Sequence, residues 1–327
     1  MDTKLRSILA REQLQHLLAV FTDQSITDSI LGELTEADLK ELGVDKLGDR
    51  KRLHVAFRAV ESDELPPVSE SKPAAKPAPK PAPKPAAKPA AKAAVPANFC
   101  RVEGGKLPAS SELGAVAVST FYIGKYPVRW SEFVEVRNWA AAHGYYSGQA
   151  GSGGRDNYPV TNVNWFQALK WCNARSEMES KTPVYKNAKG DVYRTGEEVP
   201  VVNASANGYR LPSEKEWEWA ARGGTQTHGY AYSGSEDINE VAWYDGNANR
   251  QIHVVGAKAA NELGIHDMSG NAWEWCFDDN SPGTNRVIRG GSWSYPAWIC
   301  AVGYRDNYFP NLSNNDFGFR LALSSVP

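Results

Sequence analysis

Residues 289–323 read RGGSWSYPAWICAVGYRDNYFPNLSNNDFGFRLAL, and this stretch says most about the fold. It opens with RGGSW (289–293) and closes with GFR (318–320), two strand-like segments beside turns. Between them the apolar residues follow neither the period of two of a strand nor the 3.6 of a helix. A segment that is framed by regular elements but unpatterned inside is where a scaffold usually presents a binding surface. We therefore expect residues 294–316 to form a ligand-binding surface.

The composition of residues 294–316 is also biased. The segment contains no Lys, Glu, Gln or Met. Together with Trp, these are the residues that no codon ending in a pyrimidine can encode. An Asn codon whose two adenines are randomised yields only the other residue types, so the bias is what randomised Asn codons would produce. Trp298 cannot arise in this way and is either a constant position or an exception.

This segment resembles the variable region of proteins diversified by diversity-generating retroelements, which typically runs from an RGGSW-like strand to GFR. The resemblance implies that Ala297, Cys300, Arg305 and Pro310 are constant positions. The alternative is an Asn-rich loop of a related domain that is not varied. The positions expected to vary and to contact the ligand are Ser294, Tyr295, Pro296, Ile299, Tyr304, Asp306, Asn307, Tyr308, Phe309, Leu312, Asn314, Asn315 and Asp316.

Length and charge narrow the class of protein. The chain has 327 residues, which predicts two or three domains, and a formal net charge of −2. A nearly neutral chain has no overall field that recruits nucleic acid or an anionic membrane. The first residues lack the apolar core of a secretion signal, and no run approaches the roughly 18 apolar residues of a spanning helix. We expect a cytoplasmic protein with no membrane partner and no nucleic-acid partner.

Residues 1–63 have the apolar spacing of a small helical bundle. Thr35 followed by Glu36-Ala37-Asp38 is an N-cap with an acidic first turn, which predicts a helix start. The stretch from Phe21 through LTEADLKELGV and KLGDRKRL resembles a sterile alpha motif (SAM) domain. The resemblance implies self-association or docking to a partner protein. Two alternatives remain: the helices only cap the protein, or the basic residues 50–52 contact RNA.

Residues 64–97 are a low-complexity linker. Lysine recurs at every fourth residue from Lys72 to Lys92, among Pro and Ala. Such a segment cannot bury a core, and its regular prolines favour polyproline II at about 3.1 Å per residue. We expect a disordered spacer; the alternative is a polybasic contact with an acidic partner.

Residues 98–327 form the main domain, because all eleven Trp lie between Trp130 and Trp298. Helices are expected near 131–141 and over 165–175, and a third is opened by Ser213 and Glu216 as a capping box. The motifs GYRLPSEKEWEWAARGG, AWYDGNA, ELGIHDMSGNAWEWC, RGGSW and GFRLAL occur in the order found in formylglycine-generating-enzyme/sulfatase-modifying-factor domains. The resemblance implies an α+β fold of the C-type lectin type.

Whether this domain is an enzyme depends on whether it has the catalytic residues of the family's active members. Those members bind copper through two cysteines shortly after the RGGS strand, and a cuprous ion prefers thiolates. This chain has Tyr295 at the first position and only Cys300 at the second. The four cysteines lack metal-ligand spacing and are expected to be free buried thiols, while Glu216, Glu218 and Asp267 are expected to hold the framework. We predict that the domain is not an enzyme; the alternative is a divergent oxidase.

Calcium is the one cofactor that the resemblance suggests, although none is required. Family members often hold a structural ion near the GNAWEW turn, where this chain has Gly270, Asn271, Ala272 and Glu274. Carbonyl oxygens and one carboxylate suit a hard cation. The alternative is that Glu274 is hydrogen-bonded within the framework. The expected partner is a protein or other macromolecule at residues 294–316, with self-association or docking through residues 1–63.

Overall fold

The computed structural model describes residues 34, 36–41, 44, 97–145, 151–280 and 284–325. The chain divides into two compact units, Met1–Ala86 and Ala87–Pro327. In the first unit, helix α3 spans Glu36–Glu41, directly after the predicted cap. Leu39 and Val44 are buried there, as expected for the apolar side of a small bundle. The other predicted helices of residues 1–63 and the linker up to residue 96 lie outside the described residues.

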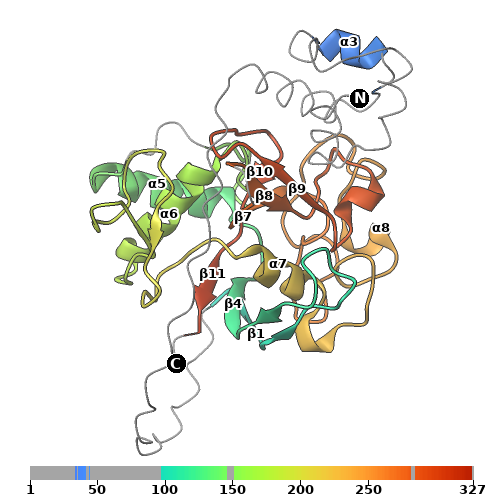
Figure 1. Ribbon diagram of the computed structural model, residues 1–327, viewed down its shortest axis with the longest axis horizontal. Coiled ribbons are helices and arrows are strands. Elements are labelled where there is room, and N and C mark those ends of the chain that lie inside the picture. Colours follow the sequence, from blue (N-terminus) through green and yellow to red (C-terminus); the bar gives the residue numbers. More distant parts are fainter. Residues whose placement is uncertain are drawn as a thin grey trace, which may run out of the picture. The chain divides into compact units, whose positions relative to one another are not determined.

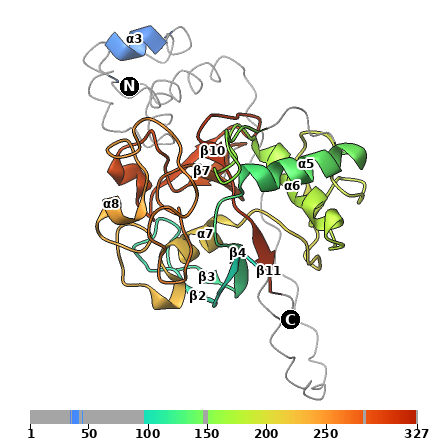
Figure 2. The ribbon, with the colours of Figure 1, turned by 180° about the vertical axis from the view of Figure 1, so that it is seen from behind.

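The second unit combines short strands with three longer helices. The strands form a three-stranded sheet of order β1-β4-β11, a four-stranded sheet of order β10-β7-β8-β9 and two small hairpins. Figure 1 shows the four-stranded sheet above the three-stranded one, with α7 between them and α5 and α6 to one side, and Figure 2 shows the same unit from behind. The elements are β1 (Phe99–Val102), β2 (Gly105–Lys106), β3 (Ala117–Val118), β4 (Phe121–Gly124), α5 (Trp130–Ala142), α6 (Trp165–Met178), β5 (Tyr185–Lys186), β6 (Val201–Val202), α7 (Glu214–Ala221), η3 (Gly224–Gln226), α8 (Ile238–Val241), β7 (Trp273–Asp279), β8 (Arg286–Arg289), η4 (Ala297–Cys300), β9 (Arg305–Tyr308), β10 (Phe317–Gly318) and β11 (Ala322–Ser324).

All three predicted helices of this unit are confirmed. Ser213 and Glu216 form the predicted capping box at the start of α7. Helix α6 has a second capping box, between Asn164 and Gln167, that the sequence reading did not identify. Such boxes satisfy amide groups that the first helical turn leaves without partners. The helix boundaries therefore follow from local hydrogen bonding.

Strand β7 is the centre of the domain. Trp273 and Trp275 face one apolar cluster, and Cys276 faces a second cluster behind the sheet. Successive side chains of a strand point to opposite faces, so a strand that is apolar on both faces is buried on both. The indole of Trp275 donates to Val163 O and that of Trp165 donates to Cys276 O, each at 2.9 Å, which ties the start of α6 to this strand.

A buried ion pair joins β7 to the C-terminal GFR motif. Arg320 donates to both carboxylate oxygens of Glu274, at 2.6 and 2.7 Å, and both side chains are fully buried. Arg320 also donates to Gly124 O of β4, and the Trp217 indole of α7 donates to Glu274 at 2.6 Å. One guanidinium–carboxylate pair therefore links both main sheets and the helix between them.

The cysteines are free thiols, as predicted, and three of the four are buried. None of the helices in the described part of the chain is long and apolar enough to cross a membrane.

We predict that Glu274→Gln lowers the free energy of unfolding by about 3–5 kcal/mol, because it leaves the buried Arg320 charge without its counterion. Urea unfolding followed by Trp fluorescence measures this. The control is Glu103→Gln, which removes the partly exposed pair with Arg101 and should cost at most about 1 kcal/mol. Equal costs for the two variants would contradict a structural role for the buried pair.

Candidate ligand-binding surface

The candidate surface begins at a second buried arginine, in the RGGSW motif. Arg289 donates to Glu218 of α7 at 2.8 Å, and both side chains are fully buried. The same guanidinium donates to Val302 O at 2.9 Å, so it holds the middle of the segment against α7. Gly291 follows with a φ of 72°, and a Cβ there would lie 2.6 Å from Cys300 Sγ. The motif therefore requires glycine where η4 packs against it.

The framework holds the segment mainly through its main chain. Val302 N donates to Ala231 O at 2.9 Å. At the N-terminus of α6, Trp165 N donates to Pro310 O at 3.0 Å and Asn162 N to Asn314 O at 2.8 Å. Pro310 and Asn314 accept through carbonyl oxygens, which every residue type has, and Val302, the N–H donor, is not among the positions expected to vary. Side chains at the positions expected to vary can therefore change without loss of this support.

Three of the four residues expected to be constant contact the framework through their side chains. Arg305 makes two hydrogen bonds to Glu214, both at 2.7 Å, and donates to Asn280. Cys300 is fully buried, and Ala297 packs against its small apolar cluster. These side chains hold the segment to α7 and to the interior at Arg305 and Cys300.

The thirteen positions expected to vary differ in exposure. Most of them are expected to be exposed, and eleven are exposed or half-buried. The two buried exceptions are Ile299, which packs in the main apolar cluster, and Asp316, which is 1% exposed. Asp316 is buried because it joins the two ends of the segment, accepting hydrogen bonds from Ser292 at 2.8 Å and Ser294 at 3.3 Å. The exposed positions are Ser294, Phe309, Leu312, Asn314 and Asn315, and the half-buried ones are Tyr295, Pro296, Tyr304, Asp306, Asn307 and Tyr308.

Aromatic rings form the floor of the surface. Tyr295 and Tyr304 pack against Trp273 of β7, with ring centroids 5.4 and 6.2 Å apart from it. Trp298 stands edge-to-face on Tyr304 at 5.3 Å and is 57% exposed. The sequence reading did not count Trp298 as a contact residue, because an Asn codon cannot give rise to Trp. The sequence did offer one indication of its exposure, because Trp298 is a large apolar residue in a segment without a helical or strand pattern.

Two aspartates, Asp306 and Asp316, influence the pKa of the Tyr295 ring hydroxyl. Burial raises the pKa of the Tyr295 hydroxyl, and the negative charges of Asp316 and Asp306 raise it further. Burial also raises the pKa of the Asp316 carboxyl, while the hydrogen bonds from the two serines lower it. The surface therefore combines half-buried aromatic rings with carboxylates.

The position of Cys300 does not suit copper. Its thiol is buried, and burial raises its pKa to about 12, which disfavours the thiolate that would bind Cu(I). Tyr295 occupies the other expected ligand position. Among the described residues, no group of three His, Cys, Asp or Glu side chains is placed to hold a metal ion.

The residues expected to bind calcium are also poorly placed for a cation. Both carboxylate oxygens of Glu274 bind Arg320, and one of them also accepts from the Trp217 indole. The Asn271 side chain is engaged as well, since it accepts from His253 N and donates to His253 O. Gly270 and Ala272 can offer only main-chain carbonyl oxygens, without a free carboxylate beside them. The Glu274 and Asn271 side chains fit the framework role better than a cation site.

The three acidic residues expected to support the framework do so. Glu216 accepts from Arg210 and from Ser213 N, and Glu218 pairs with Arg222 and Arg289. Asp267 accepts a 2.7 Å hydrogen bond from Gly256 N.

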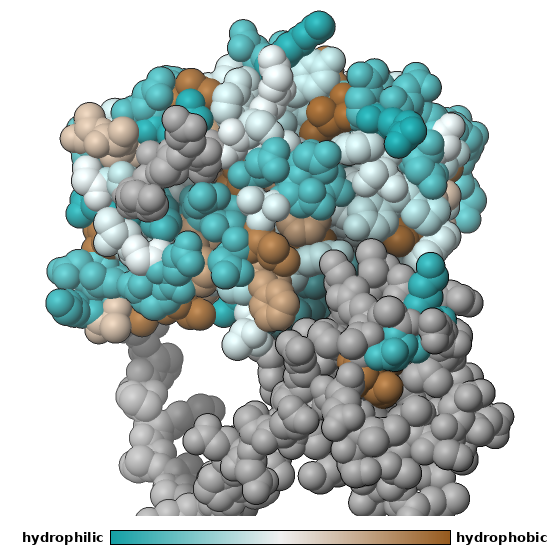
Figure 3. Space-filling model, turned by 90° about the horizontal axis from the view of Figure 1, so that it is seen from above, coloured by the Kyte–Doolittle hydropathy of each residue, from teal (hydrophilic) through white to brown (hydrophobic). Residues whose placement is uncertain are grey.

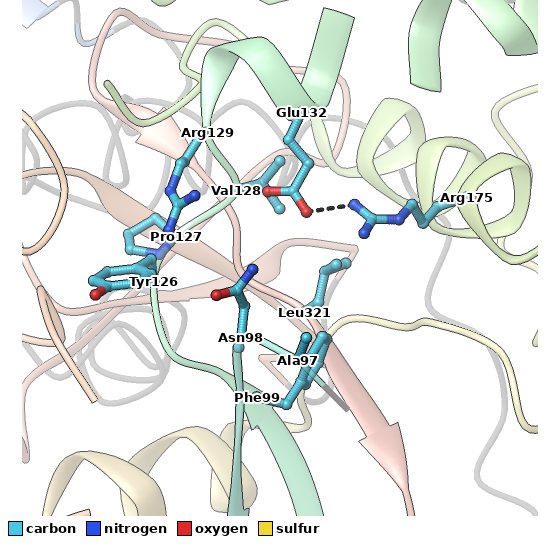
Figure 4. Close-up of a pocket in the computed structure, with 11 residues that line it drawn as sticks. Ala97, Asn98, Phe99, Tyr126, Pro127, Val128, Arg129, Glu132, Arg175 and Leu321 are labelled. Atoms are coloured by element: carbon cyan, nitrogen blue, oxygen red, sulfur yellow. Dashed lines mark hydrogen bonds and ion pairs between the residues drawn. The ribbon is translucent and has the colours of Figure 1, made fainter. Parts of the chain in front are cut away.

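A shallow hollow lies elsewhere, at the start of β1 (Figure 4). It lies between Asn98, Tyr126 and Arg129, and the ion pair of Glu132 with Arg175 forms one wall. Its free volume of about 40 Å³ has room for a few waters only. Figure 3 shows one face of the protein, on which hydrophobic residues form separate small patches among hydrophilic ones. Neither feature competes with residues 294–316 as a site for a large ligand.

Two families match the chain. The sulfatase-modifying factor enzyme 1-like domain matches residues 84–325, and the SAM domain (sterile alpha motif) matches residues 5–61. The chain belongs to the family of sulfatase-modifying factor enzyme 1-like domains, and its second unit has the α+β, C-type lectin-like fold predicted for it.

Named relatives differ in activity. The chain is 35% identical to the chaperone protein LppX of Paenibacillus barcinonensis over 259 residues, covering 68% of this chain and 88% of the relative. It is 32% identical to the inactive C-alpha-formylglycine-generating enzyme 2 of Mus musculus over 154 residues, covering 39% of this chain and 50% of the relative. It is 29% identical to the formylglycine-generating enzyme of Streptomyces coelicolor over 201 residues, covering 52% and 54%. The chain therefore spans only about half the length of the latter two.

Solved structures show the same fold. CarF aligns with a TM-score of 0.63 and 27% identity, covering 71% of this chain and 100% of CarF. Treponema denticola variable protein 1 aligns with a TM-score of 0.58 and 28% identity, covering 69% of this chain and 95% of that protein.

Proposed function

We propose that this protein is a non-catalytic binding protein whose residues 294–316 form a diversified ligand surface. The proposal rests on one observation: the backbone of this segment is bonded to the framework, while most of its side chains reach solvent. Main-chain bonds from Ala231, Asn162 and Trp165 hold its backbone, while most of the thirteen candidate side chains retain access to solvent. Such an arrangement tolerates sequence change at the surface without loss of the fold.

The composition of the surface suits a macromolecular ligand. Tyrosine supplies rigid contact area at a low cost in conformational entropy, and Ser and Asn supply adaptable hydrogen bonds. Tyr295, Tyr304 and Tyr308 are already packed on the framework, so they lose little freedom when a ligand binds. Phe309 and Leu312 add exposed apolar area at the edge.

The relatives support this reading in two ways. Similarity to a variable protein of Treponema denticola supports a segment that varies, and similarity to a chaperone protein supports a protein as the ligand. The oxidase alternative lacks a second thiolate beside Cys300, and a phenol at Tyr295 is a poor ligand for Cu(I). One mammalian relative of this family is itself described as inactive.

The SAM domain would then contribute self-association or docking. Several linked copies of a weak binding site gain avidity, because the second binding event becomes intramolecular. The Lys-Pro-Ala linker of residues 64–97 would act as a spacer between the SAM domain and the main domain.

The binding function is tested with a displayed protein library selected against the full-length chain. We expect Phe309→Ala and Leu312→Ala to weaken the selected binders, with the strongest effects at or above about tenfold in Kd. The control is Val201→Ala, which truncates an apolar residue of the β6 hairpin that is more exposed than Phe309 and Leu312. Binders that respond to the control and ignore every change in residues 294–316 would contradict the proposal.

Diversification is tested at the DNA level. We expect a near-copy of the 294–316 coding segment, with Asn codons at the thirteen positions, near a reverse transcriptase gene. Sequencing of the locus from a population of cells should show substitutions confined to these positions. An invariant segment without such a copy would favour the alternative function, in which the domain is an unvaried lectin-fold interaction or signalling module.

The role of the first unit is tested by sedimentation of the intact chain and of a chain lacking residues 1–97. We expect the shortened chain to be a folded monomer with unchanged affinity for selected binders, and the intact chain to form a larger species. A monomeric mass for both would instead leave the SAM domain as a docking module for another protein. Unfolding of the shortened chain would show that the two units share a core.

A further inference from the structure

We propose that the guanidinium of Arg286 binds a carboxylate of a protein ligand, beside the exposed residues Phe309 and Leu312 of the candidate surface. The partner protein would present an Asp or Glu side chain next to apolar residues. This inference rests on the proposed function of residues 294–316 and names one chemical feature of the ligand. Arg286 lies outside that segment, so the same contact would be available to every variant of the surface.

Arg286 lies at the edge of the candidate surface. It begins β8, and its neighbour across the sheet is Tyr308 of β9. Its guanidinium carbon lies 4.3 Å from the centre of the Trp165 ring, at the start of α6. The main-chain N–H of the same tryptophan donates to Pro310 O at 3.0 Å. One tryptophan therefore contacts both the arginine and the part of the segment that precedes Leu312.

The guanidinium of Arg286 is held in place by its surroundings. Trp165 is fully buried, and its indole donates to Cys276 O at 2.9 Å, so the ring beneath the guanidinium is fixed. Nη1 of Arg286 donates to Phe277 O at 3.4 Å. A long side chain that is already ordered loses little conformational entropy when a ligand binds.

Arg286 differs from the other buried arginines because it has no counterion. Arg289 and Arg320 are fully buried, and each forms an ion pair with a buried glutamate. Arg286 is only 6% exposed, yet within the described ranges no carboxylate forms an ion pair with it. A buried charge without a counterion is costly, and a carboxylate brought by a ligand would reduce that cost.

The free edge of the guanidinium has the geometry that a carboxylate requires. Nε of Arg286 is buried without a hydrogen-bonding partner, and Nη2 makes no hydrogen bond in the described part of the chain. Nη2 is not one of the buried atoms that lack a partner, so it keeps contact with solvent. Nε and Nη2 share one edge of the guanidinium, and such an edge binds a carboxylate through two parallel hydrogen bonds. A ligand carboxylate therefore enters at Nη2 and completes the hydrogen bonding of Nε.

Two carboxylates of the chain are near in sequence but do not occupy this edge. Asp279 of β7 lies opposite Arg286 in the sheet, but its side chain is exposed and forms no ion pair with the arginine. Asp278 is engaged elsewhere, since its Oδ2 accepts from Glu214 N at 2.7 Å. Burial lowers the pKa of Arg286, and the charges of Asp279 and Asp278 oppose this effect. A guanidinium nevertheless stays protonated at neutral pH, so Arg286 is charged.

The surroundings favour a protein carboxylate over the phosphates of a nucleic acid. Phe309 and Leu312 place exposed apolar area beside the site. Binding to a phosphate backbone depends on several Lys or Arg side chains. Arg305 is the only Lys or Arg in residues 294–316, and it is paired with Glu214. A single arginine edge among apolar residues suits one acidic side chain.

The test uses fluorescein-labelled 12-residue Gly/Ser peptides that carry three Leu-Glu, three Leu-Gln or three Leu-Lys pairs. Anisotropy is measured against the full-length chain in about 0.3 M NaCl, which screens contacts between exposed charges. We expect the Glu peptide to bind at least about tenfold tighter than the Gln peptide, with the Lys peptide weakest. This comparison changes only the probe, so it does not depend on the stability of any variant. Equal binding of the Glu and Gln peptides would overturn the proposal.

Variants of the protein then locate the contact. Arg286→Lys keeps the charge but loses the planar edge, and it should weaken Glu-peptide binding about fivefold. Arg286→Gln should weaken it about tenfold, to the level of the Gln peptide. The matched control is Arg250→Gln, which removes an exposed arginine and should leave affinity within about twofold. Near-UV circular dichroism checks that each variant is folded. An equal loss in Arg250→Gln and Arg286→Lys would show a general charge effect and contradict the assignment to Arg286.

Three further outcomes would each overturn the inference. If library binders depend on Phe309 and Leu312, carry no Asp or Glu at their contact and bind Arg286→Lys unchanged, the binding function stands and the carboxylate inference fails. If the Glu peptide binds only after Asp279→Asn, the chain's own carboxylate occupies the edge. If changing the six linker lysines to Ser abolishes the preference for Glu over Gln, the linker and not Arg286 binds the peptide.

Discussion

The fold of the second unit depends on one buried contact, the pair of Arg320 with Glu274. A buried arginine and glutamate are costly to desolvate, so they persist only where the geometry is good and the remaining hydrogen-bonding groups are satisfied. Here the remaining donors of Arg320 reach main-chain oxygens of Gly124 and His266, and Glu274 accepts from the Trp217 indole. The contact therefore fixes the register of elements distant in sequence, including strand β10 at the end of residues 294–316.

A second pair, Arg289 with Glu218, repeats this arrangement at the other end of the segment. The two framing motifs, RGGSW and GFR, each contribute one fully buried arginine that binds a glutamate of the interior. The segment between them is thus anchored at both ends by charges that do not reach solvent. Its middle is held by main-chain bonds, so the stability of the domain depends little on which side chains the surface displays.

Much of this organisation could be predicted from the sequence. The capping box of Ser213 and Glu216 is local, and the motif order identified the lectin-type fold because motifs keep their chain order in the folded domain. Long-range partners could not be predicted: nothing in the sequence shows that Glu274 meets Arg320 instead of a cation. The same limit explains Ile299 and Asp316, whose burial depends on residues far away in the chain. Trp298 was not among the candidate positions for a different reason, because the codon argument predicts which positions change and not which side chains are exposed.

Under the diversification that we propose, the buried position of Asp316 gives sequence change in this segment a second effect. Its carboxylate joins Ser292 on the framework side to Ser294 at the first outward-facing position, and its carbonyl accepts from Trp273 N at 2.8 Å. The main-chain bond would survive any substitution, whereas the bonds to the serines would not. A change at this position would therefore leave the strand in place but release the start of the segment, altering the arrangement of Tyr295 above Trp273. Variation at a buried position can in this way reshape the surface from beneath, in addition to changing the side chains on it.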